Sequence, residues 1–184
     1  RKTTSKMANK PYRFIEIRKI EKAAIIVPVT SSSRRVYIPI NFADSHAIIN
    51  ASNQVIYNSE VYMFSILSSI MNMIWVKTVG GRMKNDYRYS AEICYNTFPF
   101  PLINNDQKNL LKKSAQRILD LREKFSEMNI AEIYDPKYMP KLLLEAHKDN
   151  DLLVEKCYTN KAFLDNNERL EYLLKMYKNM NELN

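Results

Sequence analysis

Hydrophobic residues follow two different patterns along the chain, and the pattern changes close to Pro99 and Pro101. Before these prolines, short runs rich in Val, Ile, Tyr and Phe are separated by polar residues, which is typical of β-strands. These runs predict strands at residues 12–18, 24–30, 36–40, 47–50, 55–57 and 92–96. After the prolines, apolar residues recur at spacings of three and four, which is typical of amphipathic helices.

One helix is expected inside the strand-rich part. Ser59 is a suitable N-cap, Glu60 follows in the first turn, and about 18 mostly apolar residues lead to Gly80. Because this segment is apolar nearly all round, we expect the helix to be buried. Its serines on successive turns suit close packing better than catalysis.

Three helices are expected after the prolines: from Asn105 or Asp106 to about residue 127, from near Pro140 onward, and over residues 166–180. The sequence therefore predicts an α+β fold in which a mixed β-sheet with one buried helix precedes a small helical bundle. We expect two domains, at residues 1–101 and 102–184.

Charge is unevenly divided between these two parts. Residues 1–101 contain 14 Lys/Arg and 6 Asp/Glu, whereas residues 102–184 contain 14 of each. All of the net charge of +8 therefore lies in the first part. A basic module beside a neutral one indicates a polyanionic partner, because neutralising phosphates supplies much of the affinity for nucleic acid. A solubilising surface is the alternative.

Other features limit the class of protein. The chain starts at Arg1 without a charged and apolar leader, so we expect it to be part of a longer polypeptide. Residues 61–76 are interrupted by polar side chains and are too short to cross a bilayer. Cys94 and Cys157 are far apart and lack metal-ligand spacing, which favours a reducing compartment and predicts a cytoplasmic protein without a metal site.

The chain has only two glycines, Gly80 and Gly81, and a run of charged, amide and phenol side chains follows them up to Ser90. Because glycine is so rare in this chain, we expect the pair to stand where the backbone needs positive φ or where another group approaches the backbone closely. If residues 82–90 are extended, alternation puts one set of side chains on a single face and Met83, Asn85, Tyr87 and Tyr89 on the other. The first set is Arg82, Lys84, Asp86, Arg88 and Ser90.

This face has the chemistry for reading bases. Lysine can donate to guanine O6 and N7, aspartate can accept from cytosine N4, and arginine can bind a second guanine or a phosphate. Lys84 and Asp86 together would suit one G·C pair. The alternative is a solvated strand whose charges pair with one another. We expect Tyr87 and Tyr89 to pack against the module.

Two further classes of function are alternatives to DNA recognition. A protein–protein adaptor would bind through the helical part and use the positive charge only for solubility. A small hydrolase would need Ser68 or Ser69 with His147 and Asp149, but those serines lie inside an apolar helix and not on a nucleophile turn. We expect His147 to cap or hydrogen-bond, and Lys108, Lys112 and Lys113 to form a solvated helix face.

Several strings also resemble one family in matching order over residues 34–181. They include Phe64-Ser65-Ile66-Leu67-Ser68-Ser69, Thr78-Val79-Gly80-Gly81-Arg82, Asp86-Tyr87-Arg88-Tyr89-Ser90 and Tyr95-Asn96-Thr97-Phe98-Pro99-Phe100-Pro101. The flanking strings Arg35-Val36-Tyr37-Ile38-Pro39-Ile40 and Ala146-His147-Lys148-Asp149-Asn150-Asp151 agree with this. The chain resembles the target-recognition region and helical C-terminal domain of MmeI-like (type IIL) restriction-modification enzymes and related DNA methyltransferases.

The resemblance implies a module that recognises a short sequence in double-stranded DNA. It is joined to an N-terminal adenine N6 methyltransferase domain that uses S-adenosylmethionine, and in some members to a nuclease. In the family, the positions matching Lys84 and Asp86 specify one base pair, and the position matching Arg88 works with a loop that falls near residues 50–53. The motifs for methyl transfer are absent here, so we expect no activity and no cofactor in this chain itself. The candidate DNA-binding residues are Gly80, Gly81, Arg82, Lys84, Asn85, Asp86, Arg88, Ser90, Arg35 and Ser52.

Overall fold

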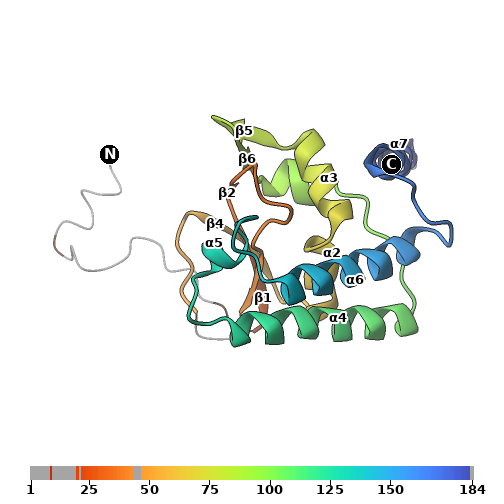
Figure 1. The fold of residues 1–184 in the computed structure, drawn as a ribbon. Coiled ribbons are helices and arrows are strands. Elements are labelled where there is room, and N and C mark those ends of the chain that lie inside the picture. The colour runs from red at the N-terminus through yellow and green to blue at the C-terminus, as the bar shows by residue number, and fades with distance from the viewer. Residues whose placement is uncertain (1–8, 10–19, 21, 44–46, 183–184) are drawn as a thin grey trace.

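A computed structural model describes residues 9, 20, 22–43 and 47–182 of the chain (Figure 1). The strand predicted at residues 12–18 lies outside the described residues. Within them, four strands precede two helices, and a two-stranded hairpin then leads into the helices that end the chain, so the α+β class predicted from the sequence is confirmed.

The strands form two small sheets rather than the single mixed sheet predicted. All described pairings are antiparallel, in the order β3-β1-β4 in the first sheet and β2-β6-β5 in the second. The first consists of β1 (Ala24–Pro28), β3 (Asn41–Ala43) and β4 (Asn53–Tyr57), and the second of β2 (Thr30–Ser31), β5 (Gly81–Met83) and β6 (Asp86–Arg88). β1 leads directly into β2, so one extended stretch of chain joins the two sheets.

The apolar helix expected before the glycines is divided in two. α2 (Val61–Leu67) and α3 (Ile70–Val79) are separated by Ser68 and Ser69. Ser69 is the N-cap of α3: its hydroxyl accepts from Asn72 N and donates to Ile66 O. The first helix starts after Glu60 rather than Ser59, whose hydroxyl donates to the Ile56 carbonyl instead.

The helices after Pro101 follow the prediction closely. Asn104 and Gln107 form a reciprocal capping box at the start of α4, which explains where this helix begins. The helices are α4 (Asn105–Lys124), α6 (Lys141–Tyr158) and α7 (Asn166–Glu182), together with the short α5 (Ile130–Ile133), which the sequence analysis did not predict.

Three predicted strands are wrong. Residues 36–40 form a loop in which Tyr37, Ile38 and Ile40 are buried, and residues 47–50 contain only an isolated bridge at Ile48. Residues Ala91–Tyr95 form the π-helix η1 instead of a strand. Runs of apolar residues produced the strand-like pattern, but none of these segments forms a strand, and Val36, Ile48 and Ile93 are exposed.

The two parts of the chain share one hydrophobic core. Ile25 of β1 and Phe64 of α2 belong to the same buried cluster as Ile118 of α4 and Leu143 of α6. A second cluster joins Trp75 of α3 to the helical part, and the Trp75 and Tyr177 ring centroids are 5.5 Å apart. Figure 1 shows β5 and β6 at the end of the molecule opposite α4.

Buried polar groups also cross between the two parts. The Tyr134 hydroxyl lies 2.7 Å from His147 Nε2 and accepts from Arg122, whose Nη1 also donates to Ile40 O. Asp151 accepts from the Tyr37 hydroxyl at 2.6 Å and from Ile70 N at 2.7 Å. The hydrogen-bonding role predicted for His147 is therefore confirmed.

The hydrolase alternative does not fit this arrangement. His147 is fully buried against Tyr134 and Tyr37, and Asp149 forms an exposed ion pair with Arg117 at 2.5 Å. The Ser69 hydroxyl donates to a backbone carbonyl. These groups serve folding, and they do not form a nucleophile, base and acid in one site.

Candidate nucleic-acid interface

The segment after the glycines is a β-hairpin, and the single extended ladder predicted for residues 82–90 is wrong. β5 and β6 pair in the register Gly81 to Arg88, Arg82 to Tyr87 and Met83 to Asp86. The chain reverses at Lys84 and Asn85, which form a two-residue turn. Lys84 therefore lies in the turn and does not share one extended strand with Asp86 and Arg88.

Lys84 occupies the tip of this hairpin in a conformation that favours glycine. Its φ is 55°, and Asn85 next to it has no positive φ. In two-residue hairpin turns of type II′, the first turn residue has positive φ and is usually glycine. Among the residues that the structure describes, none accepts a hydrogen bond from the Lys84 ammonium or forms an ion pair with it. The side chains of Lys84 and Asn85 are both exposed to solvent.

The hairpin has an inner and an outer face. Tyr87 and Tyr89 are buried on the inner face, as the sequence analysis expected. The Arg82 guanidinium lies 4.1 Å from the centroid of the Tyr87 ring and donates to Lys77 O at 3.3 Å. Arg82 is therefore on the Tyr87 side of the hairpin and not beside Asp86 and Arg88.

Asp86 connects the outer face to a neighbouring loop. Its Oδ1 accepts a hydrogen bond from the backbone N–H of Ser33 at 3.1 Å, and the carboxylate is half-buried. Within the described residues, Oδ2 accepts no hydrogen bond. Arg88 is exposed on the same face, because residues 86 and 88 alternate with the buried Tyr87. Ser90 lies outside the hairpin and is the N-cap residue of η1.

The two glycines have different local roles. Neither has positive φ. A Cβ on Gly80 would lie 2.5 Å from Val76 O and 3.3 Å from both Arg88 O and Cys94 Sγ, so Gly80 permits close approach. A Cβ on Gly81 would meet only Arg88 Cβ, at an ordinary 3.8 Å. The expectation of close approach therefore holds for Gly80, and packing does not require glycine at position 81.

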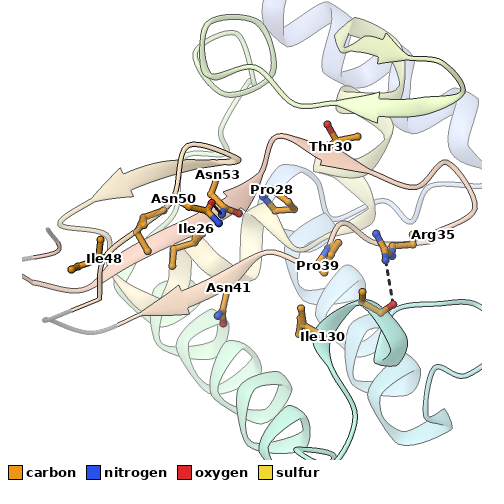
Figure 2. Close-up of a pocket in the computed structure, with 12 residues that line it drawn as sticks. Ile26, Pro28, Thr30, Arg35, Pro39, Asn41, Ile48, Asn50, Asn53 and Ile130 are labelled. Atoms are coloured by element: carbon orange, nitrogen blue, oxygen red, sulfur yellow. Dashed lines mark hydrogen bonds between the residues drawn. The ribbon is translucent and has the colours of Figure 1, made fainter. Parts of the chain in front are cut away.

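Arg35, Asn50 and Asn53 line a hollow of about 480 Å³ beside the hairpin, and Ser52 belongs to the same loop but not to the lining (Figure 2). Arg35 Nη2 donates to Ala131 O at 3.2 Å, shown as the dashed line, and this bond fixes the guanidinium against α5. Asn50 Oδ1 accepts from Ser52 Oγ and from Asn53 Nδ2, both at 2.6 Å. These bonds order the loop. Both use Asn50 Oδ1, and Asn50 Nδ2 takes no part in them.

The structure brings the predicted residues into two neighbouring groups. Lys84, Asp86 and Arg88 belong to the hairpin, whereas Arg35, Asn50 and Asn53 line the hollow. Thr30 joins the two groups, because it lines the hollow and pairs directly with Arg88 in the second sheet.

Sequence analysis missed several residues of this surface. Thr30, Asn41, Ile130 and Ala131 all line the hollow. Thr30 ends a predicted strand, so its proximity to the hairpin depends on sheet pairing that the sequence does not specify. Ile130 and Ala131 come from the helical part and reach the hollow only through the tertiary fold.

The described part of the chain lacks two other kinds of feature, a metal site and a membrane-spanning helix. Its His, Cys, Asp and Glu side chains form no group of three that could hold a metal ion. Within the same residues, no helix is both long and apolar enough to cross a membrane.

Comparison with known proteins assigns the chain to a family. The sequence profile described as "MmeI, target recognition domain" matches residues 1–102, and the profile described as "MmeI, C-terminal domain" matches residues 103–183. The chain belongs to the MmeI family. The resemblance stated from the sequence is thus confirmed.

Two relatives of this MmeI-family chain are informative. "DNA methyltransferase A" of Bacillus subtilis (strain 168) is 44% identical over 181 residues, which are 98% of this chain and 20% of that protein. A chain in the structure of the type IIL restriction-modification enzyme MmeI in complex with DNA matches with a TM-score of 0.89 and 35% identity. That match covers 99% of this chain and 24% of the MmeI chain, so this chain spans about a fifth to a quarter of these relatives.

Proposed function

We propose that this MmeI-family chain recognises a short, specific sequence in double-stranded DNA through the outer face and tip of the β5–β6 hairpin. The observation that carries the proposal is the placement of Lys84, Asp86 and Arg88 on an exposed hairpin at one end of the molecule. The related structure of MmeI was solved in complex with DNA, which supports DNA as the partner proposed for this chain.

The exposed groups have complementary donor and acceptor chemistry. The Lys84 ammonium can donate to guanine O6 and N7, and Asp86 Oδ2 can accept from cytosine N4 of the same pair. Asp86 Oδ1 stays with Ser33 N, so one carboxylate oxygen positions the hairpin and the other reads the base. Arg88 can donate two hydrogen bonds to a second guanine.

Lysine at a strained turn position also supports a role in binding. A non-glycine residue at positive φ costs about 1–2 kcal/mol, and such strain often accompanies functional sites. Lys84 has this backbone strain, and its ammonium is exposed to solvent. A ligand-binding role explains why lysine, and not glycine, occupies the tip.

Around the hairpin, Arg35 and the amides of residues 50–53 would extend the contact along the duplex. Asn50 Nδ2 can donate to a base edge or phosphate, and Ser52 is placed in the same loop. Arg82 lies over Tyr87, so in this proposal it supports the hairpin from the inner face. Gly80, Gly81, Asn85 and Ser90 shape the backbone of the hairpin and its flanks.

The module would act within a larger restriction-modification methyltransferase. In this proposal residues 1–101 read DNA, residues 102–184 form the helical domain, and an N-terminal domain of the same polypeptide methylates adenine N6. That domain would bind S-adenosylmethionine and flip the target adenine. The parent would be a cytoplasmic protein. The shared core of α2, α4 and α6 would hold the hairpin in a fixed position relative to the catalytic domain.

Selection of duplexes from a randomised DNA library, followed by sequencing of the bound fraction, tests the proposal. The wild-type chain should enrich one short sequence, with binding that weakens steeply as salt rises. The double variant Lys84→Glu/Asp86→Arg should enrich a sequence changed at one base pair. Asp86→Asn is the control for the Ser33 contact, because an amide oxygen can still accept from Ser33 N. Equal loss of affinity for every sequence in the double variant would contradict base reading.

A further inference from the structure

We propose that Met83 is an additional specificity-determining residue, which contacts the 5-methyl group of a thymine in the base pair next to the one read by Lys84 and Asp86. This inference rests on the proposed DNA-binding function. It follows from the hairpin register, which reverses the face expected for Met83 in an extended strand.

The register places Met83 on the outer face. Residues paired directly across two antiparallel strands project to the same side of the sheet. Met83 is paired with Asp86, and Arg88 is paired with Gly81 on one side and Thr30 on the other. Met83, Asp86, Arg88 and Thr30 therefore share one face, opposite the buried Tyr87.

Met83 is an apolar side chain without a place in the core. It is 49% exposed and belongs to neither buried cluster among the described residues. The Thr30 hydroxyl lies 4.0 Å from Met83 Sδ and donates to it, which positions the thioether over the outer face. A flexible, polarisable side chain in this position suits contact with an apolar group of a ligand.

Gly81 leaves space beside Met83 on this face. Only Arg88 Cβ lies within 4 Å of the point where a Gly81 Cβ would be. The outer face consequently has a gap between Met83 and Arg88 through which the edge of a base could approach. This use of glycine differs from that of Gly80, which accommodates the protein's own backbone.

Distance and chemistry select the thymine methyl group. Side chains opposite each other in an antiparallel pair have Cβ atoms about 5 Å apart, and neighbouring base pairs are about 3.4 Å apart. Met83 can thus reach the pair adjacent to the one contacted by Asp86. The C5-methyl of thymine is the apolar group that base edges present in the major groove.

The test replaces thymine with deoxyuridine, which lacks only the 5-methyl group. The wild-type chain is first used to select its preferred duplex, and each thymine in that duplex is then replaced singly. One replacement, next to the pair altered by the Lys84/Asp86 exchange, should weaken binding about four-fold, the value of burying one methyl group. Met83→Ala should bind both duplexes equally, and Met83→Leu should keep part of the difference. Leu164→Ala, which changes another exposed apolar side chain, should behave as wild type.

The outcomes separate this inference from the proposed function. If no thymine is selected beside that pair, or if deoxyuridine binds as well as thymidine, Met83 has no such role, while sequence-specific binding by the chain still stands. If Met83→Ala retains the full difference between the two bases, another residue senses the methyl group and the assignment is wrong. If the wild-type chain selects no sequence, the proposed function fails together with this inference.

Discussion

Gly80 lies so close to Val76 that a Cβ at Gly80 would come within 2.5 Å of the Val76 carbonyl oxygen. The same carbonyl accepts the Gly80 N–H at 2.9 Å, at the end of α3. Because both contacts involve backbone, neither can relax by a rotamer change. This close approach fixes the direction in which the chain leaves α3 and enters the hairpin.

The adjacent glycines therefore form a matched pair for measuring stability. We expect Gly80→Ala to lower the free energy of unfolding by about 2 kcal/mol, since overpacking of this kind typically costs 1–3 kcal/mol. Gly81→Ala should leave it unchanged or raise it by up to about 1 kcal/mol, because the new Cβ has room and the unfolded chain loses freedom. Urea unfolding of both variants checks this. Equal destabilisation would contradict the assigned roles.

Lys84→Gly should separate stability from binding. Glycine removes the strain of φ 55° but adds backbone freedom to the unfolded state, so we expect a net gain of about 0.5–1 kcal/mol. The variant should also bind the selected duplex more weakly, because the ammonium is lost. Asn58→Gly is the control: Asn58 also has φ 55°, but asparagine tolerates this region better and should gain less. Thermal unfolding and DNA titration measure the two effects; a Lys84→Gly variant that binds DNA as wild type would exclude the lysine from the interface.

The Tyr134 hydroxyl should be a major contributor to stability. It lies between Arg122 and His147, both buried, so Tyr134→Phe leaves each without this partner. We expect a loss of about 3 kcal/mol in the free energy of unfolding. Tyr138→Phe changes a tyrosine that is 54% exposed and should stay within about 0.5 kcal/mol of wild type. Similar values for the two variants would show that the buried network contributes little.

Two buried groups should make opposite contributions to the dependence of stability on pH. Burial lowers the pKa of His147 to about 3, so the unfolded state takes up a proton first and His147 destabilises the fold as pH falls below 6.5. Burial raises the pKa of Asp151 to about 7, so the folded state takes up a proton first and Asp151 stabilises the fold as pH falls from 7 toward 3.8. The two effects nearly cancel in the wild-type chain.

Asp151→Asn should expose the contribution of His147. The free energy of unfolding of this variant should fall by about 2 kcal/mol between pH 7 and pH 5, whereas that of the wild type should change by less than about 1 kcal/mol. Denaturant unfolding across this pH range measures both curves. Parallel curves for the two proteins would rule out a protonation difference at Asp151.

The sequence predicted the parts of the fold that depend on local signals. The three-and-four spacing of apolar residues located α4 within a few residues, although its N-cap is Asn104 and not Asn105 or Asp106 as expected. The break between α2 and α3 was not predicted, because the carboxylate that accepts the Ile70 N–H belongs to Asp151, 81 residues away. Local patterns cannot reveal a partner so distant in the chain.

The candidate site was predictable in composition but not in geometry. The run after the glycines was identified, yet its turn lacks the Asn-Gly or Asp-Gly pair that usually indicates a hairpin. Lys84 takes the left-handed conformation instead, and this single residue moves Met83 to the outer face and Arg82 to the inner one. The contacts of Arg35 with α5 and of Thr30 with Arg88 arise only after folding.

The most direct test of the central claim is the affinity of Arg88→Ala for the selected duplex and for each of its single-base-pair variants. Base reading by the outer face of the hairpin predicts a loss of about 1–3 kcal/mol on the selected duplex, loss of discrimination at one base pair, and unchanged discrimination at the others. Uniform weakening across all duplexes, with every preference retained, would contradict the claim and assign Arg88 to the phosphate backbone.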